Sequence, residues 1–301
     1  MEEKFKSGFV SIVGRTNVGK STLINALTEA KIAIATSKPQ TTRTAIRSII
    51  TSDKSQIIIT DTPGVHKPKT KLGEVMIDTA FGMLKEVDVI LFLIEATSTE
   101  IGKGDRMILE KLKEAGKNTI LVINKIDLVK KETLLNLMKL YSEEYDFKAV
   151  VPVSAYKEQG IKNIIDEIEK LLPYGPKYYD EDEYTDQTSR QLAEELIREK
   201  ALKLLDDEVP HGIYVECEKF KDRKTTKGED IYDIEATIYC LRESHKGIII
   251  GKAGNMLKRI STYARQDMER MLGTKVNLKV WVKVKEDWQE KDNIVKKFKL
   301  Q

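Results

Sequence analysis

The segment Gly14–Ser21 constrains the fold of this chain more than any other feature of the sequence. It reads GRTNVGKS, which matches the pattern GxxxxGK[ST], and it lies between an apolar run at Phe9–Val13 and an amphipathic segment at Lys20–Glu29. A strand, a glycine-rich loop and a helix in this order form a phosphate-binding loop, in which backbone N–H groups and the start of the helix face the phosphates. A loop whose glycines serve only a tight turn is the plain alternative, and the flanking elements argue against it.

The first 172 residues alternate short β-branched runs with longer amphipathic segments. Nearly continuous apolar strands indicate burial on both faces, so we predict an α/β domain with a doubly wound, mostly parallel sheet. The expected strands are Phe9–Val13, Ile57–Thr60, Val87–Glu95, Thr119–Asn124 and Val150–Ser154, with an edge strand near Ile46–Thr51. The expected helices are Lys20–Glu29, Leu72–Lys85, Gly104–Ala115, Glu132–Glu144 and Ile161–Leu172.

A second domain of different topology follows a segment that breaks both periodicities. That segment, PYGPKYYDEDEYTD at residues 173–186, combines prolines, tyrosines and acids and is typical of a linker. We therefore predict a domain at 1–175, a linker at 176–188 and an α/β domain at 189–301 that ends in a basic tail. The expected elements of the second domain are the helix Ser189–Asp207, the strands Ile213–Phe220, Ile231–Leu241 and Lys275–Val284, and two helices that flank Gly251–Gly254.

The charge of the chain is concentrated at its C-terminal end. Residues 241–301 carry 15 basic and 7 acidic side chains, which predicts a polyanionic partner, with nucleic acid favoured over a membrane. The two cysteines, Cys217 and Cys240, lack the spacing of a metal site and indicate a reducing compartment. The longest apolar run, Val89–Ile94, is too short to span a bilayer, so we expect a cytoplasmic protein.

Two segments are expected to bind phosphates and magnesium. In the glycine-rich loop, Lys20 can reach the terminal phosphates and Ser21 can offer its hydroxyl to Mg²⁺. The segment Asp61-Thr-Pro-Gly64 follows a strand, so Asp61 can hold Mg²⁺ through water while the Gly64 N–H donates to a γ-phosphate.

Two further segments are expected to form a guanine pocket. Asn124-Lys-Ile-Asp127 follows a strand, and the Asp127 carboxylate can accept hydrogen bonds from the guanine N1–H and N2 amine, which favours GTP over ATP. Ser154-Ala-Tyr156 can complete the pocket. Either segment alone could be a helix cap. The expected nucleotide-binding residues are Gly14, Arg15, Thr16, Asn17, Val18, Gly19, Lys20, Ser21, Thr22, Asp61, Thr62, Pro63, Gly64, Asn124, Lys125, Ile126, Asp127, Ser154, Ala155 and Tyr156.

The C-terminal domain carries a GxxG turn at Gly251–Gly254 between two helical segments. Glycines at both ends let the turn approach a sugar-phosphate backbone, and the adjoining groove of such a domain takes about four unstacked nucleotides. An ordinary helix-to-helix turn could also use two glycines, but the order helix, strand, strand, helix, helix, strand is that of a type II KH domain. The expected RNA-binding residues are Lys246, Ile250, Gly251, Lys252, Ala253, Gly254, Lys258 and Arg259.

The motifs GRTNVGKS, TTR, DTPG, NKID and SAY, in this order, resemble the GTPase domain of the translation-factor-related class, and the whole chain is similar to the Era family of bacterial GTPases. The resemblance implies a GTP-hydrolysing switch that uses GTP, GDP and Mg²⁺, binds the 3' end of 16S rRNA and assists 30S ribosomal subunit biogenesis. It implies that Thr42 joins Ser21 and Asp61 at the metal in the GTP state, and that residues 32–44 and 61–76 move between nucleotide states. The family usually has aspartate where this chain has Glu95.

The catalytic set implied by this resemblance is Asn17, Lys20, Thr42 and Gly64. Val65 follows DTPG where Ras-like enzymes carry a glutamine, and valine cannot orient water, so we expect slow intrinsic hydrolysis. Asn17 hints at stimulation by K⁺, although a simple turn asparagine explains it equally well. Arg43 and His66 are expected to be exposed and not catalytic.

The remaining expectations concern side chains near the C-terminus and the assembly. Trp281 and Trp288 could both stack bases. Trp281 lies in an alternating strand and is instead expected to be packed inside, while rRNA contact, membrane contact and plain solvation are all open for Trp288. Met256, Ile260, Met268 and Met271 are expected to form one core stripe of a helix.

We expect a monomer that does not bind DNA, with peripheral membrane association an open alternative. The rival interpretations are a metabolic P-loop kinase or ATPase, an RNA-binding scaffold with a vestigial site, and a membrane-signalling GTPase.

Overall fold

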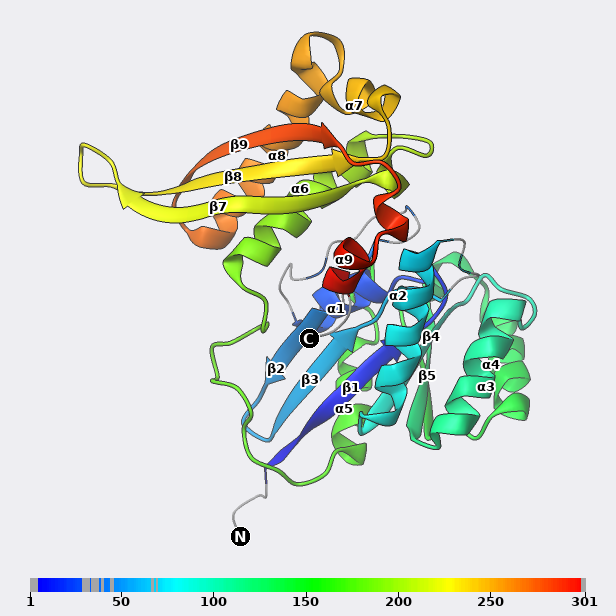
Figure 1. The fold of residues 1–301 in the computed structure, drawn as a ribbon. Helices are drawn as coiled ribbons and strands as arrows, with labels where there is room; N and C mark the ends of the chain where they lie inside the picture. The colour runs from blue at the N-terminus through cyan, green and yellow to red at the C-terminus, as the bar shows by residue number, and fades with distance from the viewer. Residues whose placement is uncertain are drawn as a thin grey trace. The chain divides into compact units, whose positions relative to one another are not determined.

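The computed structural model describes residues 5–28, 33, 38, 41–43, 46–65, 68 and 70–298. The chain divides into two compact units (Figure 1). The first comprises Met1–Ala35, Thr42–Asp186 and Lys296–Gln301, and the second comprises Thr36–Thr41 and Gln187–Val295. His66, and most of the segment 32–44 that is expected to move, lie outside the described residues.

The first unit contains a six-stranded sheet with the order β2-β3-β1-β4-β5-β6. Among the strands of this sheet that the structure describes, the edge strand β2 alone pairs antiparallel, with β3, which confirms the doubly wound, mostly parallel sheet. The strands are β1 (Lys6–Val13), β2 (Ile46–Thr51), β3 (Ser55–Asp61), β4 (Val89–Glu95), β5 (Asn118–Asn124) and β6 (Ala149–Pro152). The helices are α1 (Lys20–Thr28), α2 (Lys71–Gly82), α3 (Lys103–Ala115), α4 (Lys131–Glu144) and α5 (Ile161–Leu171).

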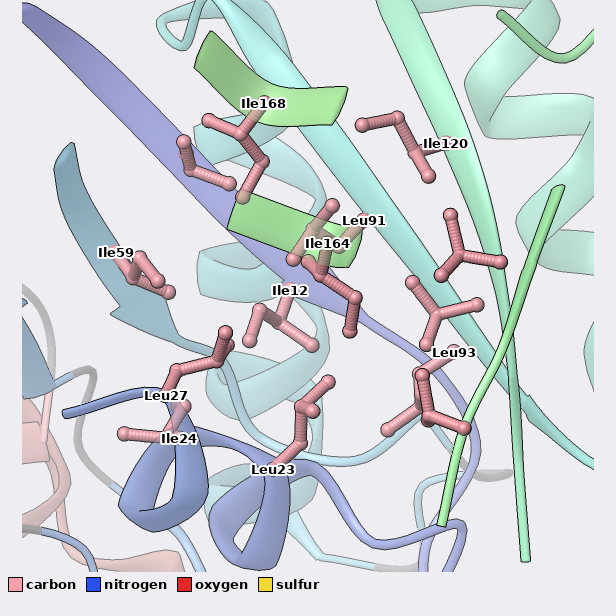
Figure 2. Packing of buried hydrophobic residues seen from close by; sticks show 14 of the residues in the cluster. Ile12, Leu23, Ile24, Leu27, Ile59, Leu91, Leu93, Ile120, Ile164 and Ile168 are labelled. Carbon is pink, nitrogen blue, oxygen red and sulfur yellow. The ribbon is translucent and has the colours of Figure 1, made fainter. Parts of the chain in front are cut away.

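Apolar side chains of the central strands pack on both faces of this sheet. In β4, Leu91 and Leu93 join the cluster formed with α1 and α5 (Figure 2), while Ile90 and Phe92 join the cluster formed with α3 and α4. Each fully buried aliphatic side chain contributes about 1.5–3 kcal/mol of transfer free energy, so both faces stabilise the sheet. This two-sided burial explains why the strand sequences are apolar throughout rather than alternating.

The second unit contains a three-stranded sheet with the order β7-β8-β9, in which β8 pairs antiparallel with β7 and parallel with β9. Helices α6 and α8 cover one face of this sheet (Figure 1). Their apolar side chains form a core with the strand side chains that point toward that face. A capping box of Thr188 and Gln191 starts α6. The elements are α6 (Ser189–Leu204), β7 (Tyr214–Lys224), β8 (Asp230–Cys240), α7 (Glu243–Ile250), α8 (Asn255–Leu272), β9 (Lys275–Val284) and α9 (Asp292–Val295).

Both tryptophan expectations need correction. Trp281 is 42% exposed, because Val280 and Val282 occupy the inward phase of β9 and the residue between them must face outward. Trp288 is 0% exposed; its indole N–H donates to the Gly212 carbonyl at 2.9 Å, and its ring packs 4.6 Å from that of Tyr214. Trp288 therefore anchors the chain after β9 and is not available for RNA, membrane or solvent.

Two smaller expectations were also wrong. Met271 is exposed rather than part of the core stripe of α8: it shares the helical phase of Ile260 and Met268 but lies in the last turn, next to the helix end at Leu272. Arg43 is buried rather than solvated, because the neighbouring Thr42 hydroxyl donates to Asp61 and holds this piece of chain against the domain. Within the part of the chain described, no helix is long and apolar enough to cross a membrane.

Candidate functional site

The sheet of the first unit brings the predicted nucleotide-binding segments to one edge. The loop Gly14–Ser21 joins β1 to α1, Asp61 ends β3, Asn124 ends β5, and Ser154 lies just beyond β6. In the sheet register Asp61 is opposite Ile12 on β1, and Asn124 is opposite Glu95 on β4. Because the carboxyl ends of parallel strands meet at the same edge, segments that are far apart in sequence can form one site.

The DTPG segment packs directly against the phosphate-binding loop. The Val65 N–H donates to the Gly14 carbonyl at 3.1 Å, and the Thr62 hydroxyl donates to the Ile12 carbonyl at 2.6 Å. A Cβ added at Gly64 would lie 2.8 Å from Cγ2 of Thr16, which is closer than side chains approach. Only glycine therefore fits at this position without displacing the loop.

Lys20 is held inside this loop by backbone carbonyls. Its ammonium donates to the carbonyls of Gly14, at 3.1 Å, and of Arg15, at 2.9 Å, and the residue is only 6% exposed. Burial lowers the pKa of Lys20 to about 8, and the Asp61 carboxylate offsets part of this shift. A cation that is desolvated in this way is well placed to gain from an anionic phosphate.

The three residues expected at the metal converge on one point. The Ser21 hydroxyl lies 3.0 Å from the Thr42 hydroxyl, and both donate to the Asp61 Oδ2 atom, at 3.1 Å from Ser21 and 2.8 Å from Thr42. Hydroxyl and carboxylate oxygens are the hard ligands that Mg²⁺ prefers in proteins. The donor set of Ser21, Thr42 and Asp61 therefore fits Mg²⁺.

Asp127 presents a carboxylate at the expected guanine pocket. The Ser154 hydroxyl donates to its Oδ1 atom at 2.6 Å, and this hydrogen bond lowers the pKa of Asp127. Asp127 therefore stays ionised at neutral pH and can only accept hydrogen bonds. Two donors on a guanine edge match such an acceptor, whereas adenine presents no equivalent pair. Tyr156 is exposed at the rim.

Asn124 connects the pocket to the phosphate-binding loop. Its side-chain amide donates to the Val18 carbonyl at 2.9 Å and accepts from the Ala155 N–H at 2.9 Å. A Cβ at Gly19 would lie 2.3 Å from the Asn124 amide nitrogen, so the loop needs glycine there. The same hydrogen bonds fix the position of Ala155 relative to the loop.

Lys125 forms a second connection, which the sequence analysis did not foresee. Its ammonium donates to the Asn17 carbonyl at 2.9 Å and pairs with Glu95 at 2.6 Å. The longer Glu95 side chain, in place of the usual aspartate, thus reaches the lysine of NKID. Asn17 is exposed and adopts a left-handed backbone, which asparagine tolerates better than most residues.

A buried carboxylate outside the motifs also holds the loop. Asp105 on α3 is fully buried, accepts from Arg15 Nε at 3.1 Å and accepts from the Tyr141 hydroxyl at 3.0 Å. Burial raises the pKa of Asp105, while the Arg15 guanidinium opposes the shift. One signal could have revealed it in the sequence: Asp105 occupies the apolar phase of α3 with Ile108 and Leu112.

The GxxG turn of the second unit has a backbone that glycine permits. Gly251 has φ 71° and ψ 174°, Gly254 has φ 74°, and Ala253 lies between them at φ 52°. A Cβ at Gly251 would lie 2.7 Å from Cβ of Met256, so α8 packs against this glycine. Of the expected RNA-binding side chains, Lys252, Lys258 and Arg259 are exposed, while Lys246 and Ile250 are half-buried.

Comparison with known proteins identifies relatives of the whole chain. The family model of the 50S ribosome-binding GTPase matches residues 9–125, and that of the KH domain matches residues 208–289. GTPase Era from Ruminiclostridium cellulolyticum is 52% identical over 292 residues, which covers 97% of this chain and 96% of the relative. The chain belongs to the Era GTPase family. Era from Thermoanaerobacter sp. is 53% identical over 293 residues, with coverage of 97% and 96%.

Solved Era structures share the fold. A crystal structure of Era in complex with MgGDPNP and nucleotides 1506–1542 of 16S ribosomal RNA has a TM-score of 0.93 and 39% sequence identity, and the match covers 98% of both chains. A variant of Aquifex aeolicus Era bound to GDP and AlF₄⁻ has the same TM-score and identity, with 98% of this chain and 99% of that chain covered. The expected P-loop GTPase fold followed by a KH domain is thereby confirmed.

Proposed function

We propose that this protein is a GTP-hydrolysing switch that binds the single-stranded 3' end of 16S rRNA through its KH domain and assists 30S subunit biogenesis. One observation supports the nucleotide part: Lys20, the oxygen cluster of Ser21, Thr42 and Asp61, and the acceptor Asp127 all follow strands that end at the same edge of the sheet. The RNA part is supported by the GxxG turn, by the basic end of the chain and by the rRNA bound to an Era relative.

In this proposal each side chain has one role in the reaction. Lys20 neutralises charge on the terminal phosphates, and Ser21, Thr42 and Asp61 would hold Mg²⁺, which would supply further neutralisation of the phosphate charge. The Gly64 N–H orients the γ-phosphate. Val65 is buried and offers no group to position water, so the isolated protein should hydrolyse GTP slowly and depend on a partner or on K⁺ near Asn17.

The proposal places the protein in the cytoplasm as a monomer with the 30S subunit as its partner and no DNA. The domain bounds 1–175 and 189–301, and the linker 176–188, are part of it. Peripheral association with the cytoplasmic face of the membrane is an alternative to which Trp288 of the C-terminal tail cannot contribute, because it is buried.

The decisive experiment measures binding of a single-stranded oligonucleotide from the 16S rRNA 3' end, with GDP and with a nonhydrolysable GTP analogue. We expect tight binding with the analogue only. Lys252→Ala in the GxxG turn should weaken it, while Lys227→Ala, an equally exposed lysine in the turn between β7 and β8, should not. Equal affinity with both nucleotides would refute the switch, and no binding in either state would refute the RNA partner.

Replacing Asp127 by asparagine tests guanine recognition against the ATPase alternative. Replacing one carboxylate oxygen by an amide donor, which opposes a guanine donor, and removing the negative charge should weaken GTP binding about 10²- to 10⁴-fold, since hydrogen bonds to charged groups contribute about 1.5–3 kcal/mol each. Xanthosine triphosphate, whose base offers a complementary acceptor to an amide, should gain affinity. Competition between labelled GTP and unlabelled xanthosine triphosphate or ATP measures both effects; an Asp127→Asn protein with unchanged GTP affinity would contradict the assignment.

A further inference from the structure

The outer face of β9 carries an exposed tryptophan inside a row of lysines. Val276, Leu278, Val280, Val282 and Val284 face the core shared with α6 and α8, so the alternate residues face away from it. Those alternate residues, which we call the β9 row, are all exposed: Lys275, Asn277, Lys279, Trp281 and Lys283.

The acidic residues next to this row are already engaged elsewhere. On the neighbouring strand β8, Asp233 pairs with Arg223 at 2.7 Å and Glu235 pairs with Lys219 at 3.4 Å, both on β7. Asp233 also accepts from the Asn277 amide at 2.9 Å. The acids of β8 therefore pair with side chains of β7 rather than with the lysines of the β9 row.

The lysines of the row are correspondingly available. Among the ion pairs of the described residues, none involves Lys275 or Lys279, and Lys283 reaches Glu218 only at 3.5 Å, with side chains 56% and 44% exposed. An ion pair this exposed contributes little to stability, so the ammonium groups of all three lysines can bind phosphate groups.

Protection of a sheet edge does not explain the whole row. Because β9 is an edge strand, lysines on it would discourage pairing with other chains. An exposed tryptophan has the opposite effect, since it adds a large apolar surface to the same strand, and large aromatic side chains are mostly buried in folded domains. The combination of one aromatic face with flanking cations is instead the composition of a platform for single-stranded nucleic acid.

We propose that the β9 row is a second RNA-contact surface, on which Trp281 stacks against an unpaired base while Lys275, Lys279 and Lys283 contact the adjoining phosphates. The inference rests on the proposed function, because it assumes an RNA ligand longer than the KH groove can hold. Such a groove takes about four nucleotides, whereas the RNA bound to the Era relative spans nucleotides 1506–1542. A contact surface beyond the GxxG turn is therefore needed to use the rest of such a ligand.

The test compares two RNAs on the full-length protein: a short oligonucleotide that fills only the KH groove, and the 16S rRNA fragment 1506–1542. Trp281→Ala should weaken binding of the long RNA about five- to hundredfold, the effect of losing one aromatic stack, and leave the short RNA unaffected. Trp281→Phe should retain most of the affinity, because an aromatic face remains. Lys279→Ala should reduce the salt dependence of long-RNA binding by about 0.7 in log–log slope, and Lys227→Ala should not.

Fluorescence gives an independent readout, because the chain has 2 tryptophans and Trp288 is fully buried. The long RNA should quench the emission of the wild-type protein but not that of Trp281→Phe. Unchanged affinity of Trp281→Ala for the long RNA, in a protein whose GTP hydrolysis is normal, would overturn the inference and leave this face to a protein partner. If the wild-type protein bound neither RNA, the proposed function would fail, and this inference with it.

Discussion

At the scale of single residues, nucleotide binding near Lys20 is coupled to binding of a proton. The buried ammonium has a pKa of about 8, so roughly half of the nucleotide-free protein has lost this proton at pH 8.0. Phosphates favour the charged form and raise the pKa again on binding. Nucleotide binding must therefore take up a proton whenever the pH lies between the two pKa values, and affinity must fall as the pH rises above 8.

The predicted proton uptake can be measured by calorimetry. In the presence of Mg²⁺, titration with GDP in two buffers of different ionisation enthalpy should show uptake of roughly half a proton at pH 8.0 and roughly a tenth at pH 7.0. The pH 7.0 titration is the internal control. Equal uptake at the two pH values would mean that Lys20 does not titrate in this range.

Asp105 shows how a residue outside every motif can act on the site. Replacing it with asparagine removes the charge that holds Arg15 but keeps an acceptor for Tyr141. Because the Arg15 carbonyl helps to hold Lys20, a looser Arg15 should weaken GDP binding about five- to thirtyfold, equivalent to about 1–2 kcal/mol.

Tyr141→Phe is the matched control for that substitution, since it removes one hydrogen bond to Asp105 and leaves the ion pair with Arg15 intact. We expect a clearly smaller loss of nucleotide affinity from it, with urea unfolding used to separate affinity from stability. The positioning role would be disproved by an Asp105→Asn protein that binds GDP as tightly as the wild type.

At the scale of elements, the GxxG turn depends on one backbone conformation. Gly251, at φ 71° and ψ 174°, lies in a region that is essentially restricted to glycine, and a Cβ there would also meet Met256. Gly251→Ala should therefore lose about 2–4 kcal/mol of unfolding free energy and most of its RNA affinity.

Gly228 provides a comparison with positive φ but without a steric contact. It has φ 82° in the turn between β7 and β8, and a Cβ there would meet nothing within 4 Å. Gly228→Ala should lose only about 1–2 kcal/mol, the cost of left-handed backbone, and keep its RNA affinity. Urea unfolding and oligonucleotide binding measure both variants, and equal losses of stability would contradict the extra cost assigned to the backbone of Gly251 and to its contact with Met256.

The elements also show where sequence reasoning reaches its limit. Periodicity and turn residues predicted every strand of both sheets, because two-sided burial in β4 or one-sided burial in β9 leaves a direct signature in the sequence. The same reasoning wrongly placed Trp281 in the core. It gave the hydrophobicity of tryptophan more weight than its position between Val280 and Val282, whose side chains face the core. Ion pairs such as Glu95 with Lys125 were out of reach, because they join residues whose proximity depends on strand order in the sheet.

At the scale of the whole molecule, the proposed switch requires a free-energy coupling between nucleotide and RNA. If a GTP analogue raises RNA affinity by some factor, RNA must raise affinity for the analogue by the same factor, since the two binding steps close a thermodynamic cycle. Couplings of this kind usually amount to about five- to 150-fold. We expect calorimetry to give equal factors in that range for the effect of the analogue on RNA affinity and for the effect of RNA on affinity for the analogue.

Asp127→Asn supplies an internal control for this coupling without disturbing the KH domain. In that variant a xanthosine triphosphate analogue, and no longer the GTP analogue, should raise RNA affinity, because only the nucleotide that occupies the site can bias the equilibrium between the two states. If the nucleotide did not change RNA affinity and RNA did not change nucleotide affinity, the two binding activities of the chain would be independent. In that case GTP hydrolysis could not control release of the RNA.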